Sequence, residues 1–211
     1  MFSARNITIL LIVILLIGGI SFLSFKGLNT PIITPNPAPT ESSDIVSIQS
    51  LPDSSTPETS EVRSPDGVMK LIMEKTTIAY NTTYSFSIEE TTQGSAKNSI
   101  LSKTVLAGTG MELSQNAWSP DNKYFFITEK SGNSINYLVF KADGEYFSEN
   151  EQYISVVPLF VAKNTGHSLK DITGWDSETL LHVYTIKEDG SRGPSFWFEI
   201  PSKAIIQLAS R

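Results

Sequence analysis

The side chains that could do chemistry in this 211-residue sequence are few and scattered. It has two histidines and no cysteine, which excludes thiol nucleophiles, disulfides and cysteine-ligated metals. His167 lies near Ser168 and Asp171 in the segment KNTGHSLKD, but such close neighbours in sequence rarely form a triad. His182 lies in an alternating apolar segment that is typical of a strand. We therefore predict that the chain has no catalytic residue and is not an enzyme.

The common motifs for cofactors and metals are also missing. Neither a Gly-x-Ser-x-Gly elbow nor a His-Glu-x-x-His motif occurs. The segment AGTGME around Gly108 and Gly110 lacks the lysine of a phosphate-binding loop. Asp121, Asp143 and Asp189 fall in turn sequences rather than in a dense acidic loop of the calcium-binding type. The sequence thus predicts no metal site and no cofactor.

The charge balance excludes another class of partner. The formal net charge is −6 and no run of basic residues occurs. Nucleic-acid binding needs clustered lysines and arginines to neutralise phosphates. We therefore expect no nucleic-acid partner.

The N-terminus contains a long apolar run, ITILLIVILLIGGISFLSF, at residues 7–25. It has no charge and is about as long as the ~20 residues that a membrane-spanning helix needs. A cleaved signal peptide is the alternative, because residues 19–21 form a passable cleavage site. Phe22 and Phe25 continue the apolar run beyond that site. We therefore predict an uncleaved transmembrane anchor over residues 1–26, with the lipid bilayer as its partner.

The charges that flank the apolar run predict its orientation. Arg5 and the free amine precede the run, whereas only Lys26 follows it before Arg63. Basic residues favour the cytoplasmic side. The sequence thus predicts a single-pass cell membrane protein with a cytoplasmic N-terminus and a C-terminal domain outside the cytoplasm.

Residues 27–63 differ in composition from the rest of the chain. They are rich in Pro, Ser and Thr, and such a segment buries too little apolar surface to offset its ordering entropy. Pro-rich tracts extend as semi-stiff spacers. We predict a disordered linker over these residues.

Residues 64–211 show the period of two that is typical of β-strands. Tyr84, Phe86 and Ile88 alternate with polar residues, which predicts a strand with one buried face. In INYLVF, residues 135–140, both faces are apolar, which predicts a strand covered on both sides. The segments SFWFEI and KAIIQLA flank Pro201 and read as a hairpin. No stretch here has a helical period, so we predict an all-β domain.

A turn motif recurs at nearly constant spacing, which indicates a structural repeat. Ser64 and Ser119 are 55 residues apart, and Trp118 and Trp175 are 57 apart. The motif residues are Ser64, Pro65, Asp66 and Gly67, then Trp118, Ser119, Pro120 and Asp121, then Trp175 and Asp176 in a degenerate third copy. Proline fixes φ, aspartate caps the turn, and Gly or Asn accepts a positive φ. We interpret the motif as scaffolding, with the tryptophan filling space between sheets.

The segment AWSPDNKYFFITEKSGNSINYLVFKADG resembles a WD40-like β-propeller repeat of the Tol-type periplasmic kind. Similar repeats occur in the propeller domains of prolyl oligopeptidase-type peptidases. The resemblance implies a β-propeller fold, but closed propellers have about 4–8 blades and only about three units fit here. We expect an incomplete, propeller-like stack of about three antiparallel sheets. The alternatives are blades that have lost their motifs and a ring completed by a second chain.

These features favour a non-catalytic binding module outside the cytoplasm, with a protein partner or self-association. The aromatic pair Tyr146 and Phe147 lies in a polar loop and could form a contact loop. The alternative functions are a sugar- or peptide-binding ectodomain of a sensor or enzyme, and a structural envelope protein.

Overall fold

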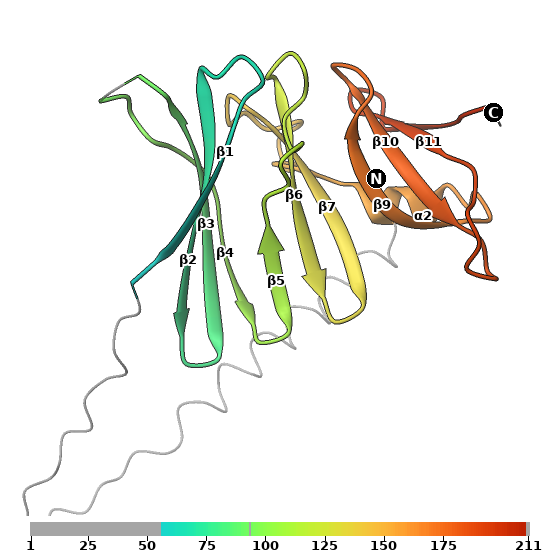
Figure 1. Ribbon diagram of the computed structural model, residues 1–211, viewed down its shortest axis with the longest axis horizontal. Helices are drawn as coiled ribbons and strands as arrows, with labels where there is room; N and C mark the ends of the chain where they lie inside the picture. The colour runs from blue at the N-terminus through green and yellow to red at the C-terminus, as the bar shows by residue number, and fades with distance from the viewer. Residues whose placement is uncertain (1–55, 93, 210–211) are drawn as a thin grey trace, which may run out of the picture. The chain divides into compact units, whose positions relative to one another are not determined.

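A computed structural model describes residues 56–92 and 94–209 of the chain. This part forms three antiparallel four-stranded sheets (Figure 1). The prediction of an all-β fold with about three antiparallel sheets is therefore confirmed. The predicted anchor at residues 1–26 and most of the predicted linker lie outside the described residues. Within the described residues, no helix is long and apolar enough to cross a bilayer.

The first sheet has its strands in sequence order. Its strands are β1 (Glu58–Arg63), β2 (Met69–Ile78), β3 (Asn81–Glu90) and β4 (Asn98–Leu106). Strand β1 lies within residues 27–63, which the sequence predicts to be a disordered linker. The prediction therefore carries the linker too far along the chain. Its register on β2 runs from Glu58 opposite Lys75 to Arg63 opposite Lys70. Only Val62 of this strand is buried, so backbone pairing rather than an apolar pattern forms it.

The middle sheet is covered on both faces. Its strands are β5 (Thr109–Glu112), β6 (Tyr124–Ser131), β7 (Ser134–Lys141) and β8 (Ile154–Ser155). In β7, Leu138 and Phe140 pack into one core, whereas Tyr137 and Val139 pack into the other. The prediction that this strand is buried on both sides is confirmed.

The last sheet follows a short helix, α2 (Val156–Ala162). Its strands are β9 (Ser168–Trp175), β10 (Leu180–Ile186), β11 (Phe196–Glu199) and β12 (Ala204–Gln207). Strands β11 and β12 pair as the predicted hairpin. The expectation of no helix is wrong for α2. This helix has seven residues and buries only Val156 and Phe160, which is too short a pattern to show a helical period.

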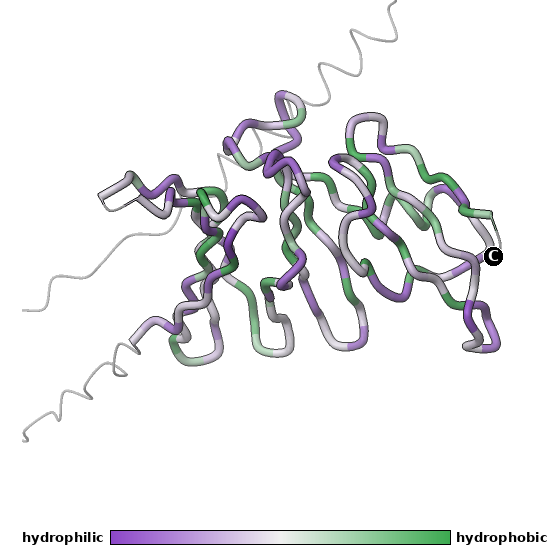
Figure 2. The backbone as a smooth tube through the Cα atoms, turned by 45° about the horizontal axis from the view of Figure 1, so that its top comes forward, coloured by the Kyte–Doolittle hydropathy of each residue, from purple (hydrophilic) through white to green (hydrophobic). Residues whose placement is uncertain are grey.

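Two hydrophobic cores hold the three sheets together. The first lies between the first and middle sheets, and its largest fully buried residues include Leu71, Phe86 and Phe125. The second lies between the middle and last sheets and includes Phe126, Phe160 and Phe198. Hydrophobic residues recur along the strands that border these cores (Figure 2). The middle sheet is thus sandwiched, and the first and last sheets each have one outer face.

Candidate interaction surface

The first two turn motifs have the same hydrogen bonds, although they are far apart in sequence. The Ser64 hydroxyl donates to Asp66 Oδ1 at 2.6 Å, and the Ser119 hydroxyl donates to Asp121 Oδ1 at 2.8 Å. Each carboxylate also accepts a backbone N–H two residues later in the chain. These bonds fix the turn from which β2 or β6 starts, so the two aspartates act as turn caps.

The residue after the aspartate completes each of these two turns. Gly67 has a φ of 73° and Asn122 has a φ of 62°, a region that Gly and Asn enter most readily. The hydroxyl of Ser64 is the main cause that lowers the pKa of Asp66. Partial burial raises the pKa of Asp121, but hydrogen bonds from Ser119 and Lys123 outweigh it and lower that pKa overall. Both carboxylates are therefore held ionised as structural acceptors.

In the third copy of the motif, the aspartate side chain has different hydrogen-bond partners. The backbone N–H of Asp176 donates to Leu180 O at 2.9 Å. Its carboxylate accepts from Trp197 Nε1 at 2.6 Å and lies 3.4 Å from His182 Nδ1. Asp176 thus serves the last sheet's own side chains rather than capping a turn.

Two tryptophans link each sheet to the preceding one. Trp118 Nε1 donates to Val62 O at 3.1 Å, and Trp175 Nε1 donates to Ala117 O at 2.9 Å. Val62 and Ala117 each lie two residues before the serine of a turn motif. The two indoles therefore bind equivalent carbonyls in successive repeats. Because each tryptophan binds back to the preceding repeat, the stack has a direction and its two ends are not equivalent.

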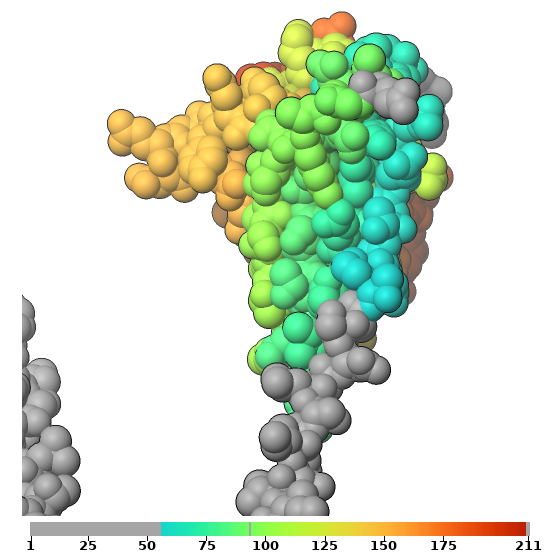
Figure 3. All heavy atoms as spheres, turned by 90° about the vertical axis from the view of Figure 1, so that its left-hand side faces the viewer, coloured from blue at the N-terminus to red at the C-terminus, as the bar shows by residue number. Residues whose placement is uncertain are grey.

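The outer face of the first sheet is polar. Lys70 lies 4.0 Å from Glu61 and 3.5 Å from Glu89, and the hydroxyls of Thr83 and Thr104 are 2.8 Å apart. Figure 3 turns this face to the viewer and shows it built from β1–β4. The charges and most of the hydroxyls that these contacts involve are thus paired with one another, which gives this end of the stack a polar face.

The outer face of the last sheet is different, because both faces of its strands carry apolar side chains. Leu181 and Val183 of β10 are fully buried in the second core, so the alternate residues of β10 point outward. We name the resulting surface the open face; it comprises Leu180, His182, Tyr184, Trp197 and Ile206. His182 pairs with Trp197 across the strands, and Trp197 pairs with Ile206. These side chains therefore form a continuous strip.

Two groups organise the open face. Asp176 holds the Trp197 indole through its hydrogen bond. The Arg192 guanidinium lies 5.4 Å from the centre of the Tyr184 ring, a distance typical of a cation–π contact. No carboxylate in the described part of the chain forms an ion pair with Arg192. The face thus combines ordered aromatic rings with an unpaired positive charge.

Tyr146 and Phe147, the two residues of the predicted contact loop, have different surroundings. Tyr146 is exposed. Phe147 stacks on Tyr124 at 6.2 Å, and Tyr124 stacks on Trp175 at 6.3 Å. The Lys141 ammonium lies 5.5 Å from the Phe147 ring. Phe147 therefore packs against the domain, and of the two residues only Tyr146 is exposed to solvent.

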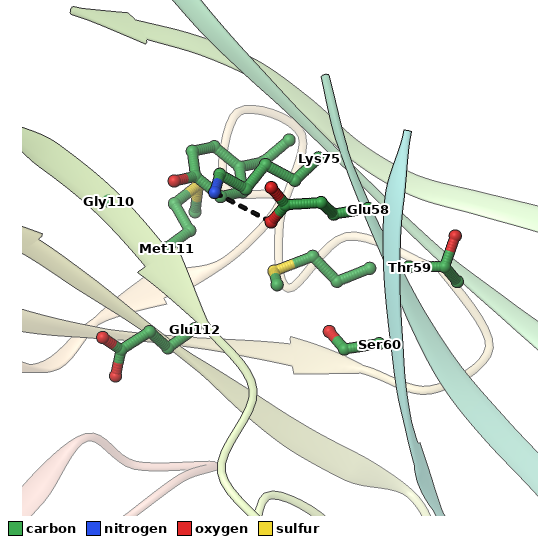
Figure 4. Close-up of a pocket in the computed structure, with 9 residues that line it drawn as sticks. Glu58, Thr59, Ser60, Lys75, Gly110, Met111 and Glu112 are labelled. Atoms are coloured by element: carbon green, nitrogen blue, oxygen red, sulfur yellow. Dashed lines mark hydrogen bonds and ion pairs between the residues drawn. The ribbon is translucent and has the colours of Figure 1, made fainter. Parts of the chain in front are cut away.

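An open cleft of about 370 Å³ lies between the first sheet and β5 (Figure 4). The side chains of Glu58 and Lys75 point toward each other in it, with 2.9 Å between Lys75 Nζ and Glu58 Oε2. The hydrogen bond from Lys75 to Glu58 is the main cause that raises the pKa of that ammonium. Each of these two charged groups therefore has a partner of opposite charge in the cleft.

The residues considered for a triad have other contacts. The Tyr137 hydroxyl donates to Asp171 Oδ1 at 2.6 Å, linking the middle and last sheets. Burial is the main cause that raises the pKa of Tyr137, and the bond to Asp171 adds to it. The His167 ring lies 6.2 Å from Phe196. Across residues 56–92 and 94–209, no three His, Asp or Glu side chains gather as a metal site would require.

Sequence reasoning placed candidate contacts in a loop and missed the open face. The segment LLHVYTI is apolar on both faces like INYLVF, a pattern that predicts a strand covered on both sides. That prediction is wrong for β10, because only the side of Leu181 and Val183 is buried in a core. A scan against protein-family models, a search of curated proteins and a search of solved structures found no match to this chain. The three antiparallel sheets are compatible with a small propeller-like domain.

Proposed function

We propose that this chain is a membrane-anchored, non-catalytic binding module that works outside the cytoplasm. In this proposal, WD40-like repeats form the propeller-like stack, and the open face binds a protein partner. The predicted anchor and the charges around it support the location. The equivalent turn bonds and Trp–carbonyl bonds of successive repeats support the repeat assignment.

The observation that carries the proposal is that the outer faces of the first and last sheets differ in polarity. Stacked repeats need a polar outer face at each end to remain soluble. The first sheet has such a face, with Lys70 bridging two glutamates. The last sheet instead presents Tyr184, Trp197 and Ile206, of which Ile206 is 44% exposed. An outer face that exposes aromatic and aliphatic side chains beside its polar groups is a surface for association.

The chemistry of the open face defines the partner. Trp, Tyr and Arg are the residue types that most often dominate protein interfaces. An apolar surface on the partner would cover Trp197 and Ile206, as the middle sheet covers the inner side of the last sheet. A carboxylate on the partner would pair with Arg192. We therefore propose a protein that presents an apolar sheet face bordered by an acidic residue.

Photo-cross-linking from the full-length chain tests this proposal. A benzophenone amino acid replaces Ile206 on the open face in one variant and Thr104 on the polar face in the control. We expect a discrete protein adduct only from position 206. The adduct partner is then purified, and its affinity is measured for the original chain and for Trp197→Ser and Arg192→Glu variants.

The outcomes separate the possible partners. Binding by the purified partner that both substitutions weaken supports the proposal. Equal adducts from both positions, or affinity unchanged by both substitutions, contradict it. An adduct that a glycosidase removes identifies a sugar ligand instead and also overturns the protein-partner proposal. A reporter enzyme fused after Arg211 tests the location separately, since activity inside the cytoplasm would contradict the proposed orientation.

A further inference from the structure

We propose that two hairpin turns of the domain contact the lipid bilayer. The turns are β2–β3 and β4–β5, and they expose three large apolar side chains. Ile78 is 54% exposed, Tyr80 is 81% exposed and Leu106 is 69% exposed. We name these three residues the apolar tip. The inference rests on the proposed membrane anchoring and adds a second, reversible contact with the same bilayer.

The apolar tip is one surface, although its residues are apart in sequence. The backbone N–H of Ala107 donates to Tyr80 O at 3.1 Å, which joins the two turns. The neighbouring β6–β7 turn is joined in the same way, because Gly132 N donates to Gly108 O at 3.1 Å. Ala79 has a φ of 53°, which Gly or Asn adopts more readily. Ala79 adopts this strained conformation where Asn would be easier, so the turn between Ile78 and Tyr80 has an apolar side chain.

The ends of the first two sheets at the apolar tip are free of charge. Residues 76–84, 104–111 and 131–140 contain no Asp, Glu, Lys or Arg. The turn of the last sheet at the same end, residues 187–192, carries two basic and two acidic residues (Figure 1). Contact with lipid is therefore confined to the tips of the first and middle sheets.

The nearest charges on these two sheets are neutralised in pairs. The pairs are Lys75–Glu58 at 2.9 Å, Lys130–Glu112 at 2.6 Å and Lys103–Glu129 at 2.5 Å. Bringing an unpaired charge close to hydrocarbon is costly. Because these ammonium groups already have carboxylate partners, the tip can approach the lipid surface without that cost.

The chain enters the domain at the same end as the apolar tip. Strand β1 starts at Glu58, which pairs with Lys75, three residues before Ile78 (Figure 1). Residues 27–57 connect this end to the predicted membrane span. The connection would therefore hold the tip at a high effective concentration near the bilayer, where exposed Tyr and aliphatic side chains favour the interface.

The absence of cysteine allows a site-specific test on the full-length chain. Asn133→Cys, on the β6–β7 turn beside the tip, carries an environment-sensitive fluorophore. Ala96→Cys, on the β3–β4 connection at the other end, carries the same label as a control. Both are reconstituted in phosphatidylcholine vesicles with and without a spin-labelled lipid that quenches the fluorophore. We expect severalfold stronger quenching at position 133 than at position 96.

A second variant assigns the contact to the apolar tip. Ile78→Ser, Tyr80→Ser and Leu106→Ser are combined with the label at position 133, and we expect quenching to fall to the control level. Equal quenching at both labels, or quenching that survives the triple substitution, overturns the inference while the vesicle-bound chain still supports the anchor. A chain that fails to float with the vesicles overturns the anchor and the inference together. A blue shift without lipid quenching indicates a second protein copy at the tip and also overturns the inference.

Discussion

The hydrogen bond between Trp118 and the Val62 carbonyl gives the most direct test of how the repeats are joined. Trp118 is only 4% exposed, and its indole bridges the first and middle sheets at 3.1 Å. Trp118→Phe keeps an aromatic ring in the first core but removes the N–H donor. We expect the variant to fold and to have a lower free energy of unfolding.

The structure sets the size of the effect. Losing the donor leaves a buried carbonyl without that partner, which costs about 1–3 kcal/mol. The smaller ring also leaves a cavity, and removal of the whole side chain by Trp118→Ala would cost about 3–5 kcal/mol. We therefore expect a loss of about 2–4 kcal/mol for Trp118→Phe, the cavity adding about 1 kcal/mol. Trp197→Phe is the matched control because it loses a hydrogen bond to Asp176 on the partly exposed open face, where about 0.5–1.5 kcal/mol is expected.

Urea unfolding of the full-length chain in detergent, followed by circular dichroism, measures both variants. Circular dichroism is chosen because each substitution removes a fluorescent tryptophan. The midpoint should fall without a change in the slope, since a similar surface is exposed on unfolding. A loss for Trp118→Phe that is no larger than that for Trp197→Phe would refute the interpretation of Trp118 as the link between the two sheets.

Three further predictions concern individual turns and contacts. Burial raises the pKa of Tyr137, and the hydrogen bond to Asp171 adds to it. The stabilisation from this phenol is therefore present below its unfolded pKa of about 10 and is lost at higher pH. The free energies of unfolding at about pH 9 and about pH 11 should differ less in Tyr137→Phe than in the original chain. Gly67→Asn should retain a melting temperature closer to that of the original chain than Gly67→Ala, because Asn122 already occupies the equivalent position with a positive φ and alanine there costs about 1–2 kcal/mol. The lowered pKa of Asp121 means that its stabilisation is present above its usual pKa of 3.8 and is lost as the pH falls, so Asp121→Asn should flatten the acid side of the stability profile.

Much of the fold could be predicted because the sequence patterns have direct physical causes. The two-sided apolar alternation of residues 135–140 predicts a sandwiched strand, and Leu138 and Val139 do face different cores. Pro120 and Asp121 predict a capped turn, and the Asp121 carboxylate accepts the hydrogen bonds that form it.

Other elements could not be predicted because their cause is not local. Strand β1 depends on pairing with β2, and its sequence ETSEVR carries a single buried residue. The open face was missed because LLHVYTI has two apolar faces, which predicts cover on both sides. Only the position of the sheet shows that, among the described residues, no other sheet covers the Tyr184 side of β10. The apolar tip was missed because the pairing of β3 with β4, which extends to the hydrogen bond from Ala107 N–H to Tyr80 O, is what brings Tyr80 near Leu106.

The direction of the stack also bears on whether a second copy could close it into a ring. Closure would place the open face of one copy against the outer face of the first sheet of another. That contact would bury Lys70 with its two glutamates, and desolvating paired charges offsets much of their attraction. It would also need an indole from the first repeat, but Arg63 stands in the place that Trp118 and Trp175 occupy, and its side chain is 65% exposed. Under the proposed function, these contacts argue for a partner of different chemistry over a two-copy ring, with Trp197 and Arg192 as the positions to test.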